Sequence, residues 1–125
     1  IKISLNAVKS KINGNSSHLE NIIINILDNA VKYSKDNPHI IVSSTNSDDN
    51  IIICIEDNGI GMDKNIQKLI FEKFYREQNG NIHDIKGHGL GLSYVKKIID
   101  FHNGKIDLES KKGVGTKFYI TLKNI

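Results

Sequence analysis

The chain has 125 residues, enough for one domain with a single core and too few for two. Hydrophobic residues make up 38% and charged residues 25%, values that are ordinary for a globular domain and argue against disorder. No apolar run approaches the ~20 residues of a membrane-spanning helix. The net charge of +3 comes without a dense basic stretch, so we expect contact with neither a membrane nor a nucleic acid.

The ends of the chain and its single cysteine suggest where it comes from. Ile1 is not a natural start, so we expect residues 1–125 to be one domain cut from a longer protein. Cys54 lies in the apolar run 51–55, which favours a buried small side chain over a reactive thiol. A lone cysteine excludes an internal disulfide and indicates a cytoplasmic domain, although the full-length protein can be anchored in the inner membrane.

Regular elements can be predicted along most of the chain. Alternating Ile and Leu predict a strand over residues 1–8, and a helix is expected over 18–33. Ser17 and Glu20 have the spacing of a capping box at the start of that helix. The later elements are strands at 39–45 and 50–56, a helix at 63–74 capped by Asp63, a polar loop at 77–86, a helix at 92–101, and strands at 105–110 and 116–123. This order predicts an α+β fold, a two-layer sandwich with a mixed, mostly antiparallel sheet and helices on one face.

The long helix carries a narrow polar stripe. At 3.6 residues per turn, Asn25, Asn29 and Lys32 share an arc of about 60°, beside an apolar stripe that should face the core. Amide oxygens can complete the shell of Mg²⁺, and an ammonium group can meet a phosphate. The helix alone favours a simpler interpretation, a solvated polar face.

Two glycine-containing segments have the composition of nucleotide loops. Asp57, Gly59 and Gly61 follow a strand, so the backbone can approach a flat ligand while the carboxylate accepts from an amine such as adenine N6. Residues 87–92 place three alternating glycines before a helix, where N–H groups can bind a polyphosphate. Neither segment is decisive alone, because Asp-Asn-Gly is a common turn and glycines also form hinges.

Taken together, these segments resemble the catalytic ATP-binding domain of sensor histidine kinases, in the superfamily of gyrase, Hsp90 and MutL. The resemblance spans about residues 3–122 and implies their Bergerat-type sandwich. The segments correspond to the N box at 25–34, the glycine boxes at 57–62, 87–92 and 113–118, and the F box at 71–76. The F box is typical of histidine kinases. Relatives that hydrolyse ATP place a glutamate base where this chain has Asn25, so efficient hydrolysis is not expected.

On the phosphate side, the resemblance implies Mg²⁺ coordination by Asn29, with Asn25 supporting the metal or the phosphates. Lys32 would contact phosphate and Arg76 would reach the γ-phosphate. His88 stands where many members carry Thr or Ser, so affinity for nucleotide should depend on pH near neutrality. The segment expected to wrap the triphosphate comprises Gly87, His88, Gly89, Leu90, Gly91 and Leu92.

On the adenine side, the resemblance implies that Asp57 holds adenine N6, while Gly59 and Gly61 clear space for the ring. Tyr33 would lie against the adenine or ribose, and Thr116 would complete the adenine end through water. Apolar contacts are expected from a further set, each member of which is equally acceptable as core: Ile60, Met62, Ile70, Phe74 and Leu92.

The resemblance implies that the chain binds Mg-ATP or ADP. It also implies delivery of the γ-phosphoryl group to a histidine on a separate helical dimerisation domain, for a response regulator receiver domain in two-component signalling. None of the five histidines here suits that acceptor role, so a monomeric fragment that does not autophosphorylate is expected. Two alternatives stay open: an anti-sigma-type serine kinase, and a nucleotide-binding regulatory module without transfer.

Overall fold

The computed structural model describes residues 1–8, 10–72 and 91–125. Arg76, Phe74 and the predicted polar loop lie outside these ranges, as do Gly87, His88, Gly89 and Leu90. Within the described ranges, no helix is both long enough and apolar enough to cross a membrane. The elements are β1 (Lys2–Leu5), α1 (Ser16–Lys32), β2 (Ile40–Ser47), β3 (Asn50–Asp57), α2 (Lys64–Leu69), α3 (Gly91–Phe101), β4 (Lys105–Lys111) and β5 (Gly115–Lys123).

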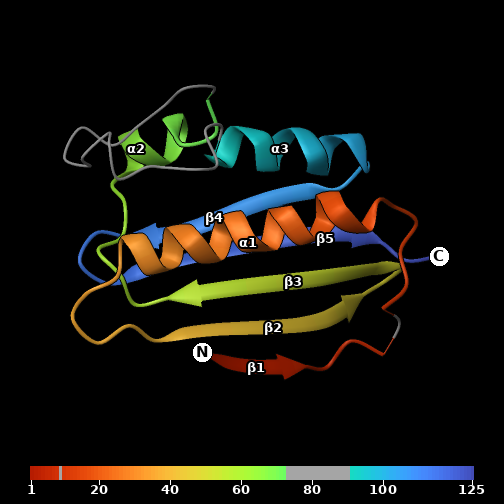
Figure 1. The fold of residues 1–125 in the computed structure, drawn as a ribbon, viewed down its shortest axis with the longest axis horizontal. Coiled ribbons are helices and arrows are strands. Elements are labelled where there is room, and N and C mark those ends of the chain that lie inside the picture. The colour runs from red at the N-terminus through yellow and green to blue at the C-terminus, as the bar shows by residue number, and fades with distance from the viewer. Residues whose placement is uncertain (9, 73–90) are drawn as a thin grey trace.

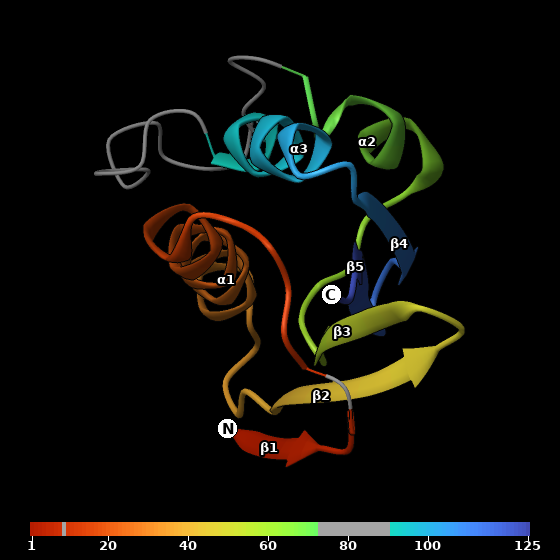
Figure 2. The same cartoon turned by 90° about the vertical axis from the view of Figure 1, so that its right-hand side faces the viewer.

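The strands form one mixed sheet with the order β1-β2-β3-β5-β4 (Figure 1). β1 runs parallel to β2, and the other neighbouring strands are antiparallel. Figure 2 shows α1 and α3 against one face of this sheet, with α2 beside α3 near the β4 edge. The predicted two-layer sandwich, with its mixed sheet and helices on one face, is therefore confirmed.

The start of α1 differs from the prediction. The helix begins at Ser16, and its cap is Asn15, whose side-chain oxygen accepts from the N–H of His18 at 3.1 Å. Asn15 has the extended backbone that a cap requires, and Asn caps helices as well as Ser does. The predicted capping box of Ser17 and Glu20 is wrong, because Ser17 already lies in the first helical turn.

Other element boundaries are shorter or shifted. Asp63 caps α2 as predicted, accepting from the N–H of Ile66 at 2.9 Å, but the helix ends at Leu69. The first strand covers only Lys2–Leu5, less than the predicted 1–8. Helix α3 begins at Gly91, one residue before the predicted start.

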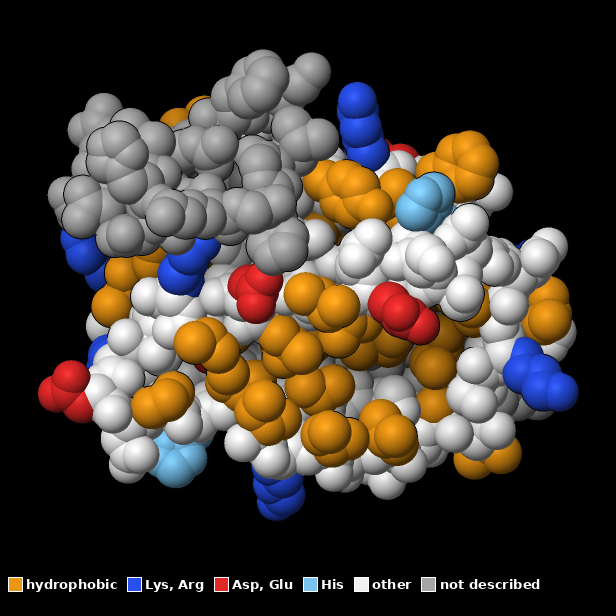
Figure 3. Space-filling view, in the orientation of Figure 1, with side chains coloured by type: hydrophobic (Ala, Val, Ile, Leu, Met, Phe, Trp, Pro, Cys, Tyr) orange, Lys and Arg blue, Asp and Glu red, His pale blue; other side chains and the backbone are white. Residues whose placement is uncertain are grey.

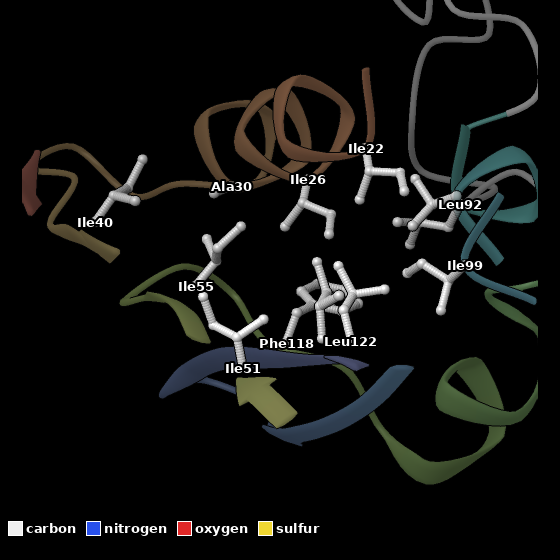
Figure 4. Packing of buried hydrophobic residues seen from close by; sticks show 12 residues of the cluster. Ile22, Ile26, Ala30, Ile40, Ile51, Ile55, Leu92, Ile99, Phe118 and Leu122 are labelled. Carbon is white, nitrogen blue, oxygen red and sulfur yellow. The ribbon is translucent and has the colours of Figure 1, made fainter. Parts of the chain in front are cut away.

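The core lies between the helices and the sheet. Ile22, Ile26 and Ala30 recur at four-residue spacing on α1 and point toward the sheet in Figure 4. They meet Ile55 and Phe118 from β3 and β5, while Val95 and Ile99 of α3 close the layer. Burial of one such side chain stabilises the fold by roughly 1.5–3 kcal/mol. The apolar stripe predicted on the helix is therefore the face that fixes α1 on the sheet.

Apolar side chains also gather on the outside, across the α1 face of the molecule (Figure 3). The exposed apolar side chains of the chain include Ile24 and Val31 of α1, and Ile3 and Leu5 of β1, which are 63% and 71% exposed. A contiguous apolar surface of this kind is typical of a contact site for another domain.

Cys54 is a free, partly exposed thiol in β3. Burial raises its pKa, and the nearby Glu56 carboxylate raises it further. The side chain is thus less buried than the sequence predicted, but its thiol stays protonated near neutral pH, which disfavours reactivity.

Candidate functional site

Three segments far apart in sequence meet at one end of the sheet. The carbonyl of Tyr33, at the end of α1, accepts from the N–H of Ile60 at 3.0 Å. The carbonyl of Ile60 accepts in turn from the N–H of Gly113, in the turn between β4 and β5, at 2.6 Å. Asp57 and Thr116 are register partners in β3 and β5. The end of the N box, the first glycine box and the last glycine box are thus brought together.

Asp57 ends β3 as a half-buried carboxylate. Its Oδ1 accepts from the N–H of Gly59 at 2.8 Å, which holds the side chain in one orientation. Burial raises the pKa of Asp57 above its usual 3.8, while the backbone N–H groups of Gly59 and Thr116 work against that rise and Glu56 adds to it. Oδ2 keeps lone pairs for a further donor, so the side chain is a fixed acceptor of the kind an exocyclic amine needs.

Glycine is required around Asp57 for a reason that the sequence did not reveal. A Cβ on Gly59 would collide with the carbonyl of Tyr33, and a Cβ on Gly61, whose φ is +68°, with the carbonyl of Lys111. Gly115 has a φ of +147° and abuts the carbonyl of Asp57. The sequence suggested that Gly59 and Gly61 make room for adenine. In the structure they allow backbone segments to approach one another, whether or not a ligand is bound.

Ser110 links the loops around the site, and sequence reasoning gave no signal for it. Its hydroxyl accepts from the N–H of Met62 at 2.8 Å and donates to the carbonyl of Gly115 at 3.0 Å. The hydroxyl oxygen of Thr116 lies 2.8 Å from the hydroxyl oxygen of Ser110. Because the single Ser110 proton goes to Gly115, Thr116 is the donor of this pair and keeps its lone pairs for another partner. Thr116 is only 7% exposed, so its hydroxyl is held in place by the surrounding loops.

The polar stripe of α1 lies at the same end of the molecule. Asn25 is 8% exposed, and its Nδ2 donates to the carbonyl of Asn21 at 2.7 Å. A carbonyl can only accept, so it is Nδ2 that faces Asn21, and Oδ1 points away from that carbonyl. Asn29 is half-buried one turn later, and Lys32 is exposed in the last turn. The stripe is therefore partly buried, unlike a fully solvated polar face.

The chemistry of this stripe fits Mg²⁺. Two amide oxygens are hard ligands of the kind Mg²⁺ accepts, and they leave most of its octahedral positions for phosphate oxygens and water. Among the residues that the structure describes, no group of three or more His, Cys, Asp or Glu side chains could hold a metal. A metal at this stripe would be held by the amide oxygens of Asn29 and Asn25 together with phosphate oxygens and water.

The apolar candidates divide between core and surface. Leu92 is buried in the core beside α1, and Met62 and Ile70 pack partly against the same cluster. Ile60 is 47% exposed at the mouth of the site. Gly91 opens α3 with a φ of +54°, and a Cβ there would lie within 4 Å of no atom of the described residues. Among the members of the set that the structure describes, Ile60 is the most exposed and therefore the most open to a ligand.

Comparison with known proteins places this geometry in a family. Residues 14–124 match the family described as histidine kinase-, DNA gyrase B- and HSP90-like ATPase. The chain belongs to this family. It is 48% identical over 124 residues to the sensor protein RprX of Bacteroides fragilis (strain YCH46), covering 98% of this chain and 24% of RprX. It is 38% identical over 114 residues to the heme sensor protein HssS of Staphylococcus saprophyticus, covering 91% of this chain and 24% of HssS.

Solved structures agree with this assignment. The mycobacterial sensor histidine kinase MprB superposes with a TM-score of 0.82 at 27% identity, covering 98% of this chain and 83% of that one. The histidine kinase domain of the Escherichia coli osmosensor EnvZ gives 0.72, also at 27% identity, covering 99% and 74%. The chain spans about a quarter of the length of the curated relatives it matches. It corresponds to their ATP-binding catalytic domain of the histidine kinase type.

Proposed function

We propose that this domain binds Mg-ATP and supplies its γ-phosphoryl group to a histidine on a separate helical dimerisation domain, within a two-component pathway. The observation that carries the proposal is the fixed, half-buried Asp57 carboxylate, held by Gly59 beside the end of the Asn25–Asn29 stripe. Oδ2 of Asp57 accepts from adenine N6, and the lone pairs of Thr116 receive a water at the same end of the base. The ribose side lies toward Tyr33.

The phosphates lie along α1. Asn29 and Asn25 hold Mg²⁺ against the phosphate oxygens, and the exposed Lys32 neutralises phosphate charge. Arg76 and the glycine box at 87–92 complete the triphosphate end. Bound Mg²⁺ would supply charge neutralisation and template the phosphates for in-line displacement.

The design is suited to delivering a phosphoryl group, not to splitting water. Asn25 stands where hydrolysing relatives carry a glutamate, and an amide cannot take a proton from water. Phosphoryl transfer depends mainly on positioning and on charge neutralisation, both of which this domain provides. The histidine acceptor comes from the dimerisation domain, for which the apolar surface over α1 and β1 offers a contact site. The phosphohistidine then passes its group to a response regulator receiver domain.

His102 illustrates why the chain itself does not supply the acceptor. Its Nδ1 lies 2.8 Å from the carbonyl of Ile98, and its Nε2 accepts from the N–H of Asn15 at 3.2 Å. Both ring nitrogens are used to fix the end of α3 to the cap of α1, so His102 is not free to attack a phosphate. That no other histidine of this chain accepts the phosphoryl group stays a prediction from the sequence.

Calorimetric titration of ATP, with and without Mg²⁺, tests the proposal. ATP should bind more tightly with Mg²⁺, and Asn29→Ala should abolish that difference. Asn21→Ala is the matched control, because it removes an exposed amide two turns earlier on the same helix and leaves the carbonyl used by Asn25. A folded protein that binds no ATP, or an Asn29→Ala variant that keeps the full Mg²⁺ dependence, would contradict the assignment.

Transfer is tested separately with the dimerisation domain added in trans and γ-labelled ATP. Label should appear on that domain as an acid-labile phosphohistidine. Acid-stable phosphoserine would favour the anti-sigma-type serine kinase, and ATP binding without any transfer would favour a regulatory module.

A further inference from the structure

A groove on the far side of α2 is separate from the nucleotide site. It has a volume of about 360 Å³ and runs between α2 and β4. Lys64, Gln67, Lys68 and Phe71 form one wall, and residues 106–108 of β4 form the other. None of these residues belongs to the nucleotide site described above.

The β4 wall is an open sheet edge. β4 is the last strand in the order, and within the described residues it pairs only with β5. Its outer edge therefore offers backbone donors and acceptors to an added strand. Along β4, the exposed residues Lys105, Asp107 and Glu109 are charged, with Lys105 lying 3.5 Å from Asp107. A charged edge discourages indiscriminate strand pairing and favours a partner of matching charge.

The α2 wall carries a stripe of two cations and one aromatic ring. Lys64 and Lys68 have the i, i+4 spacing of one helix face, and Phe71 follows two residues after the end of α2. Within the part of the chain that the structure describes, neither lysine forms an ion pair. Four helical residues rise about 6 Å, close to the ~6.6 Å between side chains two apart on an extended strand. Acidic side chains at i and i+2 of an extended peptide would thus match the two lysines.

Contacts with neighbouring residues hold the α2 wall of the groove in place. Nε2 of Gln67 donates to the carbonyl of Met62 at 2.8 Å and to that of Ser110 at 3.1 Å. Phe71 meets Phe118 edge to face, with ring centroids 6.4 Å apart. These contacts hold α2 at a constant distance from β4, so the groove keeps its shape without an occupant.

We propose that this groove binds an extended acidic segment of a partner protein. The segment adds as a strand to the edge of β4, with acidic residues at i and i+2 against Lys64 and Lys68 and an apolar side chain on Phe71. A nucleic acid fits less well, because Asp107 contributes a carboxylate to the lining and an edge strand pairs with a peptide backbone and not with a sugar-phosphate chain. This inference does not depend on the proposed nucleotide site.

The test uses a labelled peptide, acetyl-Thr-Asp-Thr-Asp-Thr-Leu-Thr-amide, its sequence-reversed form, and versions with Asn in place of Asp. Fluorescence anisotropy measures affinity for the intact chain and for the double variant Lys64→Gln/Lys68→Gln. The double substitution should weaken at least one acidic peptide on the order of tenfold, as expected for two exposed ion pairs. The control Lys11→Gln/Lys97→Gln removes two exposed lysines that do not line the groove and should leave affinity unchanged.

Backbone amide shifts measured by NMR locate the peptide. Peptide binding should move the amides of β4 and α2. The inference would be overturned by no binding at about 1 mM peptide, the weak end of specific association, or by equal binding of the Asn versions. An unchanged affinity in the lysine variant would also contradict it. So would amide shifts confined to α1 and β1, or displacement of the peptide by a single-stranded oligonucleotide. Since both lysines are exposed, their substitution does not disturb the core, and the ATP titration on the same variant reports separately on the nucleotide site.

Discussion

Asp57→Asn should separate binding from folding, because Oδ1 has a partner within the fold and the proposed nucleotide contact falls to Oδ2. Oδ1 accepts from the N–H of Gly59, and an Asn side chain can keep that bond through its own oxygen. The amide NH₂ then replaces Oδ2 and turns a donor toward the adenine amine, which is itself a donor. Loss of a hydrogen bond to a charged group costs about 1.5–3 kcal/mol, or roughly tenfold to a hundredfold in affinity for ATP.

The fold should tolerate the same substitution. Burial raises the pKa of Asp57 because it disfavours the charged form, so the Asp57 side chain contributes most to stability below pH 3.8, where it is a neutral carboxylic acid. That contribution is lost as the pH rises through the folded-state pKa. The neutral Asn side chain does not titrate, so the Asp57→Asn protein does not lose this contribution. Its unfolding free energy should therefore increase relative to that of the parent as the pH rises from about 4 toward neutrality.

Calorimetry with ATP and urea unfolding at several pH values measure the two effects. Glu56→Gln is the control for ATP affinity alone, because it removes the neighbouring carboxylate, which lies 3.9 Å from Lys117 and also contributes to the raised pKa of Asp57. An Asp57→Asn protein that is folded and binds ATP as tightly as the parent would refute the adenine assignment. A relative stability that moves in the opposite direction with pH would refute the argument from burial.

Three further substitutions test the packing around the site. Ile26→Ala, at a position 1% exposed, should lower the unfolding free energy by about 2–5 kcal/mol in urea titrations, whereas Ile24→Ala, at 46% exposure, should cost far less. Gly115→Ala should lower both the melting temperature and the affinity for ATP, because the added Cβ meets the carbonyl of Asp57 in β3. In the control Gly113→Ala, the added Cβ meets no atom of the described residues, so the variant should lose only about 1–2 kcal/mol to backbone strain. Ser110→Ala should lower the unfolding free energy by about 1–3 kcal/mol in urea titrations and weaken the binding of ATP, because it leaves the N–H of Met62 without its partner. An unchanged affinity for ATP would mean that the loops keep their positions without the Ser110 hydroxyl.

Much of this protein could be predicted from local sequence. The four-residue recurrence of Ile22, Ile26 and Ala30 identified the buried face of α1, since helical periodicity is recorded in the chain itself. The four strands that form the antiparallel pairs β2–β3 and β4–β5 were predicted from β-rich runs, close to their observed bounds. The ordered glycine and asparagine motifs identified the family before any coordinates were known. The roles of Asn29 and Lys32 toward a nucleotide stay predictions.

Tertiary structure decided what depends on contacts between distant residues. Ser110 joins Met62 across 48 positions, and nothing near Ser110 in the sequence records that partner. The parallel pairing of β1 with β2 and the choice of Asn15 over Ser17 as the cap also depend on where the chain enters the fold. Gly59 looked like a residue chosen to admit a ligand, yet the nearest atom to its missing Cβ is a backbone oxygen from α1. Residue type and spacing determine local conformation, whereas contacts between distant backbone segments form only when the helix layer packs on the sheet.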